Sequence, residues 1–303
     1  MKATEQADPL IRPTGTTEEA WNGWPGLTKL PFVGAEELVP DGTRVVVVAP
    51  HPDDEVLMIG GLLVQLARKG IPVRVIAVTD GTASHRGSTA WTPQILQQIR
   101  PRESRAALRC LGITEPPLRL RFDDGALSKQ DGRLAQRLCG LIDQHDIVFT
   151  TWRRDGHPDH EATGRACAFA TRRRHARLVE VPVWAWNWAE PGDPRLPWRT
   201  ACRLPLDSDA KRRKCFAMQA YESQILPDVS TGAEPILDAV MLLRAARPFE
   251  VLFPEDHLTR SGRAIPPRPA RSNSRTSAST PDGPNTDPDT TRRADRGRSN
   301  SRP

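Results

Sequence analysis

The sequence predicts an α/β fold with a Rossmann-like, doubly wound and mostly parallel sheet. Two observations carry this prediction. Apolar strand-like runs alternate with helix-like segments along most of the chain, and no segment recurs at the fixed period of a repeat protein. We therefore expect a single folded domain over residues 41–260. An N-terminal extension over residues 1–40 should pack on this domain, and residues 264–303 should form a disordered C-terminal tail.

The strand-like segments are short and apolar, and the segments between them have helical periodicity. In chain order, strands are expected over residues 44–49, 73–79, 118–121, 147–151, 178–183 and 249–253. Helices are expected over residues 60–69, 93–111, 132–144, 159–174 and 209–221. Asp207 or Ser208 is a suitable N-cap for the last of these helices.

The two ends of the chain differ in composition from the region between them. In the irregular N-terminal stretch, Trp21, Trp24 and Phe32 are the expected anchors onto the domain. The tail is rich in Pro, Arg, Ser, Thr, Asn and Asp, and it has too little apolar surface to offset the entropy of an ordered chain. Its eight Arg and four acidic residues supply +4 of the formal net charge of +6. The rest of the chain is therefore close to neutral.

Composition also limits compartment and partners. The start of the chain lacks the apolar region of a secretory signal, and no run approaches the roughly 18 apolar residues of a membrane span. The five cysteines are odd in number and widely spaced, which favours a reducing, cytoplasmic setting. The tail's basic residues are interleaved with Asp and lack aromatic neighbours, so no nucleic-acid partner is expected. Nothing in the sequence specifies an oligomeric state.

Two short polar clusters follow apolar runs about a hundred residues apart. Residues 51–55 (His-Pro-Asp-Asp-Glu) come just after four consecutive valines, and residues 157–160 (His-Pro-Asp-His) come shortly after the strand-like run at 147–150. Open α/β sheets bind ligands outside the carboxyl ends of such strands. Histidines, an aspartate and a spare carboxylate at one such place are the parts of a hydrolytic zinc centre.

The spacing within each cluster suits a shared ion. His51 and Asp54 are three positions apart, as are His157 and His160, and this spacing places side chains on one face of a first helical turn. The proline in each cluster suits a strand-to-helix junction. The alternative is that both clusters only form turns and helix caps. Their shared position after strand-like runs favours a metal site.

The two clusters resemble those of the LmbE/PIG-L family of metal-dependent, N-acetylglucosamine-type deacetylases. Other segments that fit the family in order are Thr-Asp-Gly at 79–81, Arg100 with Glu103, Leu-Gly at 111–112 and Tyr-Glu-Ser-Gln at 221–224. The resemblance covers residues 44–224. It implies a zinc enzyme, with Fe²⁺ as the alternative metal, that removes an N-acetyl group from a small-molecule amino-sugar substrate.

The resemblance also implies roles for individual residues. His51, Asp54 and His160 match the three metal ligands. Asp53 matches the general base, and His157 matches the histidine that stabilises the oxyanion or acts as an acid. Asp159 is expected to hydrogen-bond His157 and to set its tautomer.

Other functions share parts of this pattern. A hydrolase of another amide or an ester would use the same activated water, and a non-catalytic sugar-binding protein could keep the same fold. A dinucleotide-binding oxidoreductase would need a Gly-x-Gly-x-x-Gly turn after the first strand, where this chain has His-Pro-Asp-Asp-Glu. A structural four-thiolate site is excluded because the chain has no Cys-x-x-Cys pair.

The substrate is less well specified than the chemistry. Some relatives that deacetylate thiol-pathway glycosides have a tyrosine where this chain has Asp155. Arginines at 100, 102, 153 and 154 could bind phosphate or carboxylate on a substrate, or they could be solvated or paired with acids. His85 lies in the loop over residues 81–91, which is rich in small and polar residues. It could approach the metal, but we expect it to be solvated. The tryptophans at 184, 186 and 188 could form a stacking wall for a sugar, although packing is the favoured role.

Overall fold

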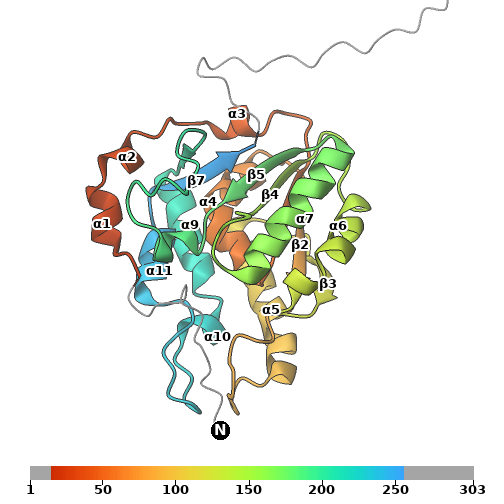
Figure 1. Cartoon of the computed structure of the whole chain (residues 1–303), viewed down its shortest axis with the longest axis vertical. Coiled ribbons are helices and arrows are strands. Elements are labelled where there is room, and N and C mark those ends of the chain that lie inside the picture. The colour runs from red at the N-terminus through yellow and green to blue at the C-terminus, as the bar shows by residue number, and fades with distance from the viewer. Residues whose placement is uncertain (1–14, 256–303) are drawn as a thin grey trace, which may run out of the picture. The chain divides into compact units, whose positions relative to one another are not determined.

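The computed structural model describes residues 15–255, in which seven strands form one mixed sheet. The strands are β1 (Val45–Ala49), β2 (Val73–Thr79), β3 (Leu118–Phe122), β4 (Ile147–Thr151), β5 (Arg177–Val181), β6 (Cys202–Pro205) and β7 (Phe249–Pro254). Their order is β3-β2-β1-β4-β5-β7-β6, and Figure 1 labels β3, β2, β4, β5 and β7 in this sequence across the sheet. The first five are parallel, and β7 is antiparallel to both β5 and β6. The predicted α/β class with a mostly parallel sheet is confirmed.

The chain reverses its direction across the sheet between β1 and β4. From β1 it passes through β2 to the edge strand β3, and it then returns to place β4 against the other side of β1. β1 pairs with β4 in parallel from Val45 with Ile147 to Val48 with Thr150, so the carboxyl ends of the two strands are adjacent. In open parallel sheets, the crevice outside such a reversal is the usual ligand site.

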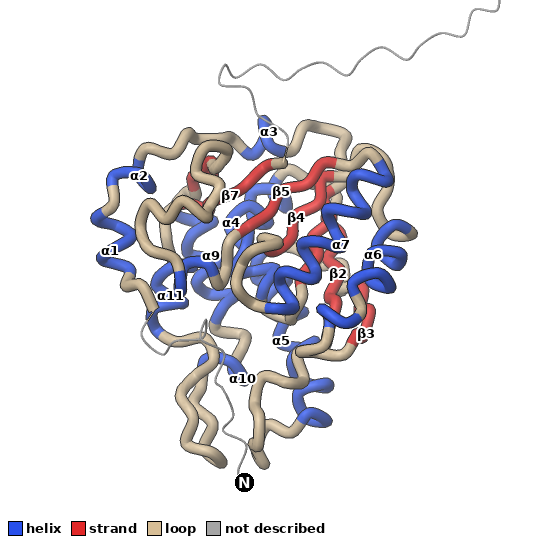
Figure 2. Tube along the Cα trace, viewed as in Figure 1, coloured by secondary structure: helices blue, strands red, loops and turns tan. Residues whose placement is uncertain are grey.

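Helices cover both faces of the sheet (Figure 2). The longer helices are α4 (Asp54–Arg68), α5 (Pro93–Leu111), α6 (Asp131–Cys139), α7 (Pro158–Arg174) and α9 (Ser208–Met218). Val45 and Val47 of β1 belong to a core with α4, α5 and α9, whereas Val46 and Val48 belong to a second core with α6 and α7. Because successive residues of a strand point to opposite faces, an all-apolar strand can serve both cores.

The remaining helices are short. They are α1 (Glu18–Gly23), α2 (Pro25–Thr28), α3 (Ala35–Leu38), the 3-10 turn η1 (Leu127–Lys129), α8 (Ala185–Trp188), α10 (Glu222–Ile225) and α11 (Ala239–Ala245).

The predicted elements agree with the structure except at some boundaries. Helix α9 begins after Asp207, whose side chain accepts a hydrogen bond from Ala210 N at 2.8 Å, as its predicted N-cap role requires. Helix α4 begins at Asp54 rather than at residue 60, because the turn after β1 leads directly into the helix. Strand β6 was not predicted: its four residues, Cys-Arg-Leu-Pro, carry no clear strand pattern.

Helix α4 is bent at Ile59, where the backbone leaves helical geometry (φ −138°, ψ 28°). The buried Glu250 carboxylate accepts hydrogen bonds from Gly61 N (2.7 Å) and Leu62 N (3.0 Å). The buried Lys214 ammonium donates to Leu57 O (3.1 Å) and to Glu250 (2.7 Å). This ion pair satisfies the backbone groups freed by the bend, as buried polar groups require.

Of the three residues expected to anchor the N-terminal extension, Trp21 is the main anchor in its described part. Trp21 is fully buried, and its Nε1 donates to Trp186 O at 3.0 Å. Trp24 is partly buried against the same cluster, in which Trp198 lies 4.7 Å from it between ring centroids. The expectation for Phe32 was wrong, because 64% of this residue is exposed, with its ring against the guanidinium of Arg203.

All five cysteines are free thiols. Within residues 15–255, no helix is long and apolar enough to cross a membrane. The tail predicted over residues 264–303 lies outside the described residues.

Candidate metal centre

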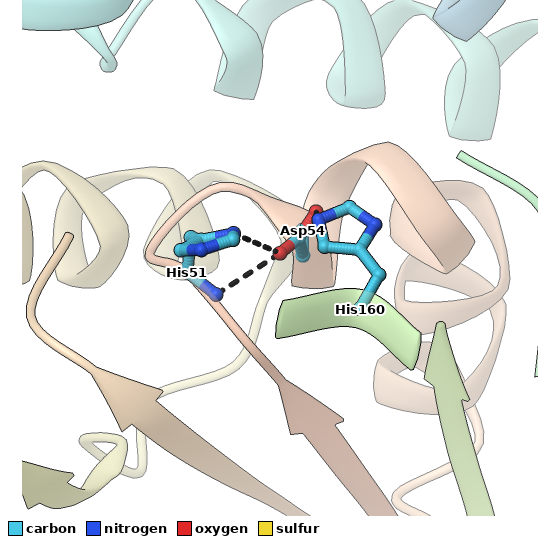
Figure 3. A group of neighbouring side chains, drawn as sticks. All are labelled: His51, Asp54 and His160. Atoms are coloured by element: carbon cyan, nitrogen blue, oxygen red, sulfur yellow. Dashed lines mark hydrogen bonds and ion pairs between the residues drawn. The ribbon is translucent and has the colours of Figure 1, made fainter. Parts of the chain in front are cut away.

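The turn after β1 places His51 against Asp54. The Asp54 carboxylate accepts a hydrogen bond from the backbone N of His51 at 3.0 Å, and the same oxygen lies 3.1 Å from His51 Nδ1 (Figure 3). Asp54 is the first residue of α4 and is buried, whereas His51 is half-buried. The first cluster therefore presents one imidazole and one carboxylate on the same turn.

The first turn of α7 supplies His160. Pro158 is the first residue of this helix and His157 is its N-cap. A Cβ on Gly164 would lie 2.7 Å from Thr151 O, so only glycine lets α7 approach the end of β4 this closely. His160 is buried, and its Nε2 lies 3.3 Å from Asp54 Oδ1. Figure 3 shows His51 and His160 on opposite sides of Asp54.

His51, Asp54 and His160 each offer one ligand atom, and these atoms all lie within 4.8 Å of one another. Two imidazole nitrogens and one carboxylate oxygen make a donor set typical of a catalytic zinc site. The set fits a divalent ion, although it does not distinguish zinc from Fe²⁺. A second group with the same property shares His51 and adds Asp124 and Asp159.

Mutual electrostatics set the charges of this group. Burial alone would raise the pKa of Asp54, but His160 and His51 hold it well below its usual value. Burial alone would lower the pKa of His160, but Asp54 and Asp155 raise it to about 9. His51 behaves likewise: its carboxylate neighbours, led by Asp124, overcome burial and raise its pKa well above the usual value.

His157 has the opposite environment. Burial and the two neighbouring histidines lower its pKa to about 2, so it is neutral near pH 7. Its Nδ1 accepts a hydrogen bond from Asp159 N at 3.2 Å. The proton of the neutral ring is therefore on Nε2, which can act as a donor.

Asp159 hydrogen-bonds His157 as expected, but through its backbone N–H, and its carboxylate has other partners. Its oxygens accept hydrogen bonds from Gly125 N (2.7 Å) and Leu127 N (3.1 Å), and one of them lies 3.5 Å from His51 Nε2. The backbone of Asp159, rather than its side chain, contacts His157, because His157 is the N-cap of the helix in which Asp159 lies. The sequence therefore predicted the contact, but not that the backbone makes it.

Asp53 points to a different partner from that of Asp54. Arg100 Nη2 donates to Asp53 Oδ2 at 2.8 Å, and both side chains are buried. Arg100 also donates to Gly81 O at 2.8 Å, which fixes the guanidinium. Burial raises the pKa of Asp53 even though Arg100 opposes the shift. Arg100 is thus held inside the site and is not free to bind a substrate anion at the surface.

Glu55 connects this region to the distant segment 221–224. Its carboxylate accepts hydrogen bonds from Ser104 Oγ, Tyr221 OH (3.0 Å) and Asp53 N (3.0 Å). Burial raises the pKa of Glu55 to about 7 despite these donors. The only tyrosine of the chain therefore supports the turn that carries Asp53 and Asp54.

Asp155 holds His160 from the side opposite Asp54. The fully buried Asp155 carboxylate lies 2.7 Å from His160 Nδ1. It also accepts hydrogen bonds from three consecutive backbone N–H groups, those of residues 183–185, at 2.8–3.0 Å. Partners of this kind fix the ring and tautomer of a metal-ligating histidine.

Sequence reasoning missed the roles of Asp155 and Asp124, although a signal existed for each. Asp155 lies five positions before His160, in the same loop. Asp124 follows β3, just as the cluster at residues 51–55 follows β1.

Aromatic residues occupy one side of the site. The Trp184 ring stacks on the His157 ring, with 5.9 Å between centroids. Trp186 is buried in the aromatic cluster with Trp21, and Trp188 Nε1 donates to Asp155 O at 2.7 Å. Packing is therefore the main role of these tryptophans, and only Trp184 lies against a predicted site residue. His85 was expected to be solvated, but it is largely buried (9% exposed).

Of the two alternatives for Arg153, a substrate anion or pairing with acids, the structure favours pairing with acids. Arg153 pairs with Glu180 at 2.8 Å and with Glu255 at 2.9 Å.

Comparison with known proteins tests the family resemblance. Residues 46–171 match the family described as PIG-L: GlcNAc-PI de-N-acetylase. This match covers less than half of the chain, and the matched residues are similar to the PIG-L family. The resemblance drawn from the two clusters is thus confirmed, and both clusters lie within the matched residues.

Relatives of this chain are named as deacetylases. A probable N-acetyl-alpha-D-glucosaminyl L-malate deacetylase 2 of Bacillus cereus is 32% identical over 136 residues, which are 43% of this chain and 61% of the relative. A protein of the same name from Bacillus anthracis is 28% identical over 62% of this chain and 84% of its own length. A 1D-myo-inositol 2-acetamido-2-deoxy-alpha-D-glucopyranoside deacetylase of Mycobacterium sp. (strain KMS) is 30% identical over 50% of this chain.

The length of the match differs among these relatives. The chain spans 61%, 84% and 55% of their respective lengths, so for two of the three it covers less than two thirds.

Solved structures resemble the fold of this chain. The A40926 pseudoaglycone deacetylase Dbv21 has a TM-score of 0.52 at 26% identity, covering 71% of this chain and 97% of that structure. A deacetylase of the teicoplanin biosynthesis pathway has a TM-score of 0.53 at 22% identity, covering 70% of this chain and 97% of that structure. The second likeness supports the fold alone.

Proposed function

We propose that this protein is a metal-dependent N-deacetylase that hydrolyses the N-acetyl group of an amino-sugar substrate. The observation that carries the proposal is the convergence of His51, Asp54 and His160 outside the carboxyl ends of β1 and β4, within the residues that match the PIG-L family. The names of the relatives, which act on N-acetylglucosaminyl malate and on an acetamido-deoxy-glucopyranoside, favour an N-acetylglucosaminide as the substrate.

His51, Asp54 and His160 would hold the metal, which we expect to be zinc, with Fe²⁺ as the alternative. A divalent ion bound there would polarise the substrate carbonyl and lower the pKa of a water molecule to near 7. With three protein ligands, one coordination position of the ion would stay open for water or substrate, as catalytic metal sites require.

Asp53 is the proposed general base. Its carboxylate lies next in sequence to a metal ligand but is bound to Arg100 instead, which holds it in one orientation. Burial raises its pKa, which makes it a better proton acceptor than an ordinary aspartate near neutral pH. After taking a proton from the attacking water, Asp53 can return that proton to the leaving amine.

His157 is the proposed stabiliser of negative charge on the acetyl oxygen. It is neutral, and its Nδ1 is engaged by the backbone of Asp159, so its Nε2–H is the available donor. One donor of this kind contributes about 3 kcal/mol to the transition state. In this assignment Asp159 acts through its backbone N–H on His157, while its carboxylate holds the loop at 125–127.

The test is acetate release from a panel of N-acetylglucosaminides by metal-reconstituted protein. We expect release from at least one member, loss of release after chelation, and recovery when the metal is restored. His160→Ala should abolish both metal binding and release. A protein that binds one metal ion per chain but releases no acetate from any member would instead support a hydrolase of another amide or an ester.

A further inference from the structure

On its α5 side, strand β3 departs from the apolar pattern of the sheet. Leu120 and Phe122 of β3 pack against the core on the opposite face, which leaves Arg119 and Arg121 on the α5 side. In β1 and β2, the corresponding side is apolar and packs against α4 and α5. The edge of this face therefore carries charged side chains where core residues would ordinarily lie.

A β-bulge accompanies these arginines. Ala77 pairs with Arg119 and Thr79 pairs with Phe122, so β3 contains one more residue than β2 between these pairs. Arg121 lies in the bulge with φ 56°, a conformation that few residues other than glycine adopt. Bulges of this kind redirect a side chain, and Arg121 lines the same cavity as Arg119.

The cavity lies between β3 and the middle of α5 and has a volume of about 530 Å³. Helix α5 contributes Arg102 and Arg105 to its wall, together with the amide side chains of Gln97 and Gln98. Pro52 also lines it, but His51, Asp54 and His160 do not. The cavity is thus separate from the metal centre, although it reaches the turn that carries it.

The charge of the lining is strongly positive. The four arginines face a single lining carboxylate, that of Asp80, which Arg119 Nε binds at 2.7 Å. Arg102, Arg105 and Arg121 are exposed, and their side chains make no hydrogen bond or ion pair with any of residues 15–255. Three guanidinium groups at one cavity are therefore available to a ligand.

We propose that this cavity binds the phosphate group of a small-molecule ligand. Guanidinium groups bind phosphate oxygens in a bidentate manner, and several together suit an anion with more than one charge. A carboxylate carries only one charge and would leave more of the positive potential uncompensated. A volume of several hundred Å³ is typical of a small-molecule site. Binding can be measured directly, so the proposal does not depend on deacetylase activity.

The test is calorimetric titration of inorganic phosphate into metal-reconstituted protein. We expect saturable binding that weakens at least tenfold in the Arg102→Gln, Arg105→Gln double variant. The matched control is the Arg109→Gln, Arg137→Gln double variant. It removes the same charge from two exposed arginines outside the cavity and should change the affinity less than twofold. Equal affinity in wild type and the cavity variant would overturn the proposal, because the phosphate would then bind at the metal or elsewhere.

A kinetic comparison distinguishes two sources of the phosphate group. If the substrate carries it, the cavity variant should raise KM for N-acetylglucosamine 1-phosphate at least fivefold and leave KM for N-acetylglucosamine unchanged. If a separate ligand carries it, neither KM should change while phosphate binding is still lost. Absence of acetate release from any substrate would contradict the proposed function alone, since the calorimetric result would stand.

Discussion

At the scale of single residues, Asp155 joins two parts of the site. Its carboxylate contacts His160, and it also accepts the three N–H groups that shape the turn beginning at Val183. That turn carries Trp184, which stacks on His157. One buried side chain thus positions a proposed metal ligand and the wall beside the proposed oxyanion donor.

Asp155→Asn should weaken zinc binding by about 10- to 100-fold, the usual effect of losing a partner of a ligating histidine. The asparagine amide has the size of the carboxylate, but it cannot accept hydrogen bonds from both His160 and the three backbone N–H groups. Competition with a chromophoric chelator measures the affinity. Asp143→Asn, at an exposed carboxylate, is the control and should have no effect. Unchanged zinc affinity in Asp155→Asn would show that the residue supports only the loop.

Metal affinity should rise with pH between 7 and 9. In the metal-free site the pKa of His160 is raised to about 9, and that of His51 is also raised well above its usual value. Both rings are therefore protonated at pH 7, and each must lose its proton before it can bind a metal. Chelator competition at several pH values gives the slope. Affinity that is constant from pH 7 to 9 would contradict the assignment of these two histidines as ligands.

At the scale of elements, the bend in α4 depends on one buried ion pair. Glu250 of β7 binds the N–H groups that begin the second half of the helix, and Lys214 of α9 binds a carbonyl of the first half. Three elements are thus tied together behind the turn that carries Asp53 and Asp54.

Lys214→Met should destabilise the protein by about 3–5 kcal/mol, because Glu250 would remain buried without its counter-ion. Urea unfolding followed by circular dichroism measures the change. Lys211→Met, on an exposed position of the same helix, should change stability by less than about 0.5 kcal/mol. If the two variants had similar stability, the ion pair would not support the bend.

The parallel strands and the long helices were predictable because their apolar patterns are local and strong. β6 was not predictable, because its four residues form a strand only by pairing with β7. The start of α4 was misplaced because its first two residues, Asp54 and Glu55, are polar, and only the tertiary structure shows that they are buried.

At the scale of the whole domain, residues 15–40 add an aromatic cluster to the sheet edge at β6 and β7. Trp21 packs against Trp186 with 4.9 Å between ring centroids, and Phe253 of β7 belongs to the same cluster. The buried Arg247 pairs with Glu18 at 2.7 Å and contacts the Trp186 ring. This cluster adjoins α8, which follows the turn bound by Asp155.

Trp21→Ala should lower the free energy of unfolding by about 3–5 kcal/mol, since it empties a fully buried site. Phe32→Ala, at an exposed aromatic residue in the same segment, should cost less than about 1 kcal/mol. Chemical denaturation of both variants provides the comparison. An equal, small effect would mean that the N-terminal segment contributes little to the fold.

The proximity of the two clusters could be predicted from the sequence, because each follows a strand and parallel strands end at one edge. The residues that support them could not all be found in this way. Arg100 and Tyr221 reach Asp53 and Glu55 from segments about 50 and 170 positions away, and only long-range packing brings them there. The carboxylate partners of Asp159 were also missed, since the loop at 125–127 that it binds is brought there by tertiary structure.

The most direct test of the proposed metal-dependent deacetylation is to measure metal content and acetate release together in wild type and Asp53→Asn. The wild type should bind one ion per chain and release acetate. Asp53→Asn should keep its metal, because Asp53 is bound to Arg100 and is not one of the three ligands. Its acetate release should fall by at least about 100-fold, as expected for loss of a general base. Loss of the metal from Asp53→Asn, or release at the wild-type rate with the metal retained, would contradict the division of roles between Asp53 and Asp54.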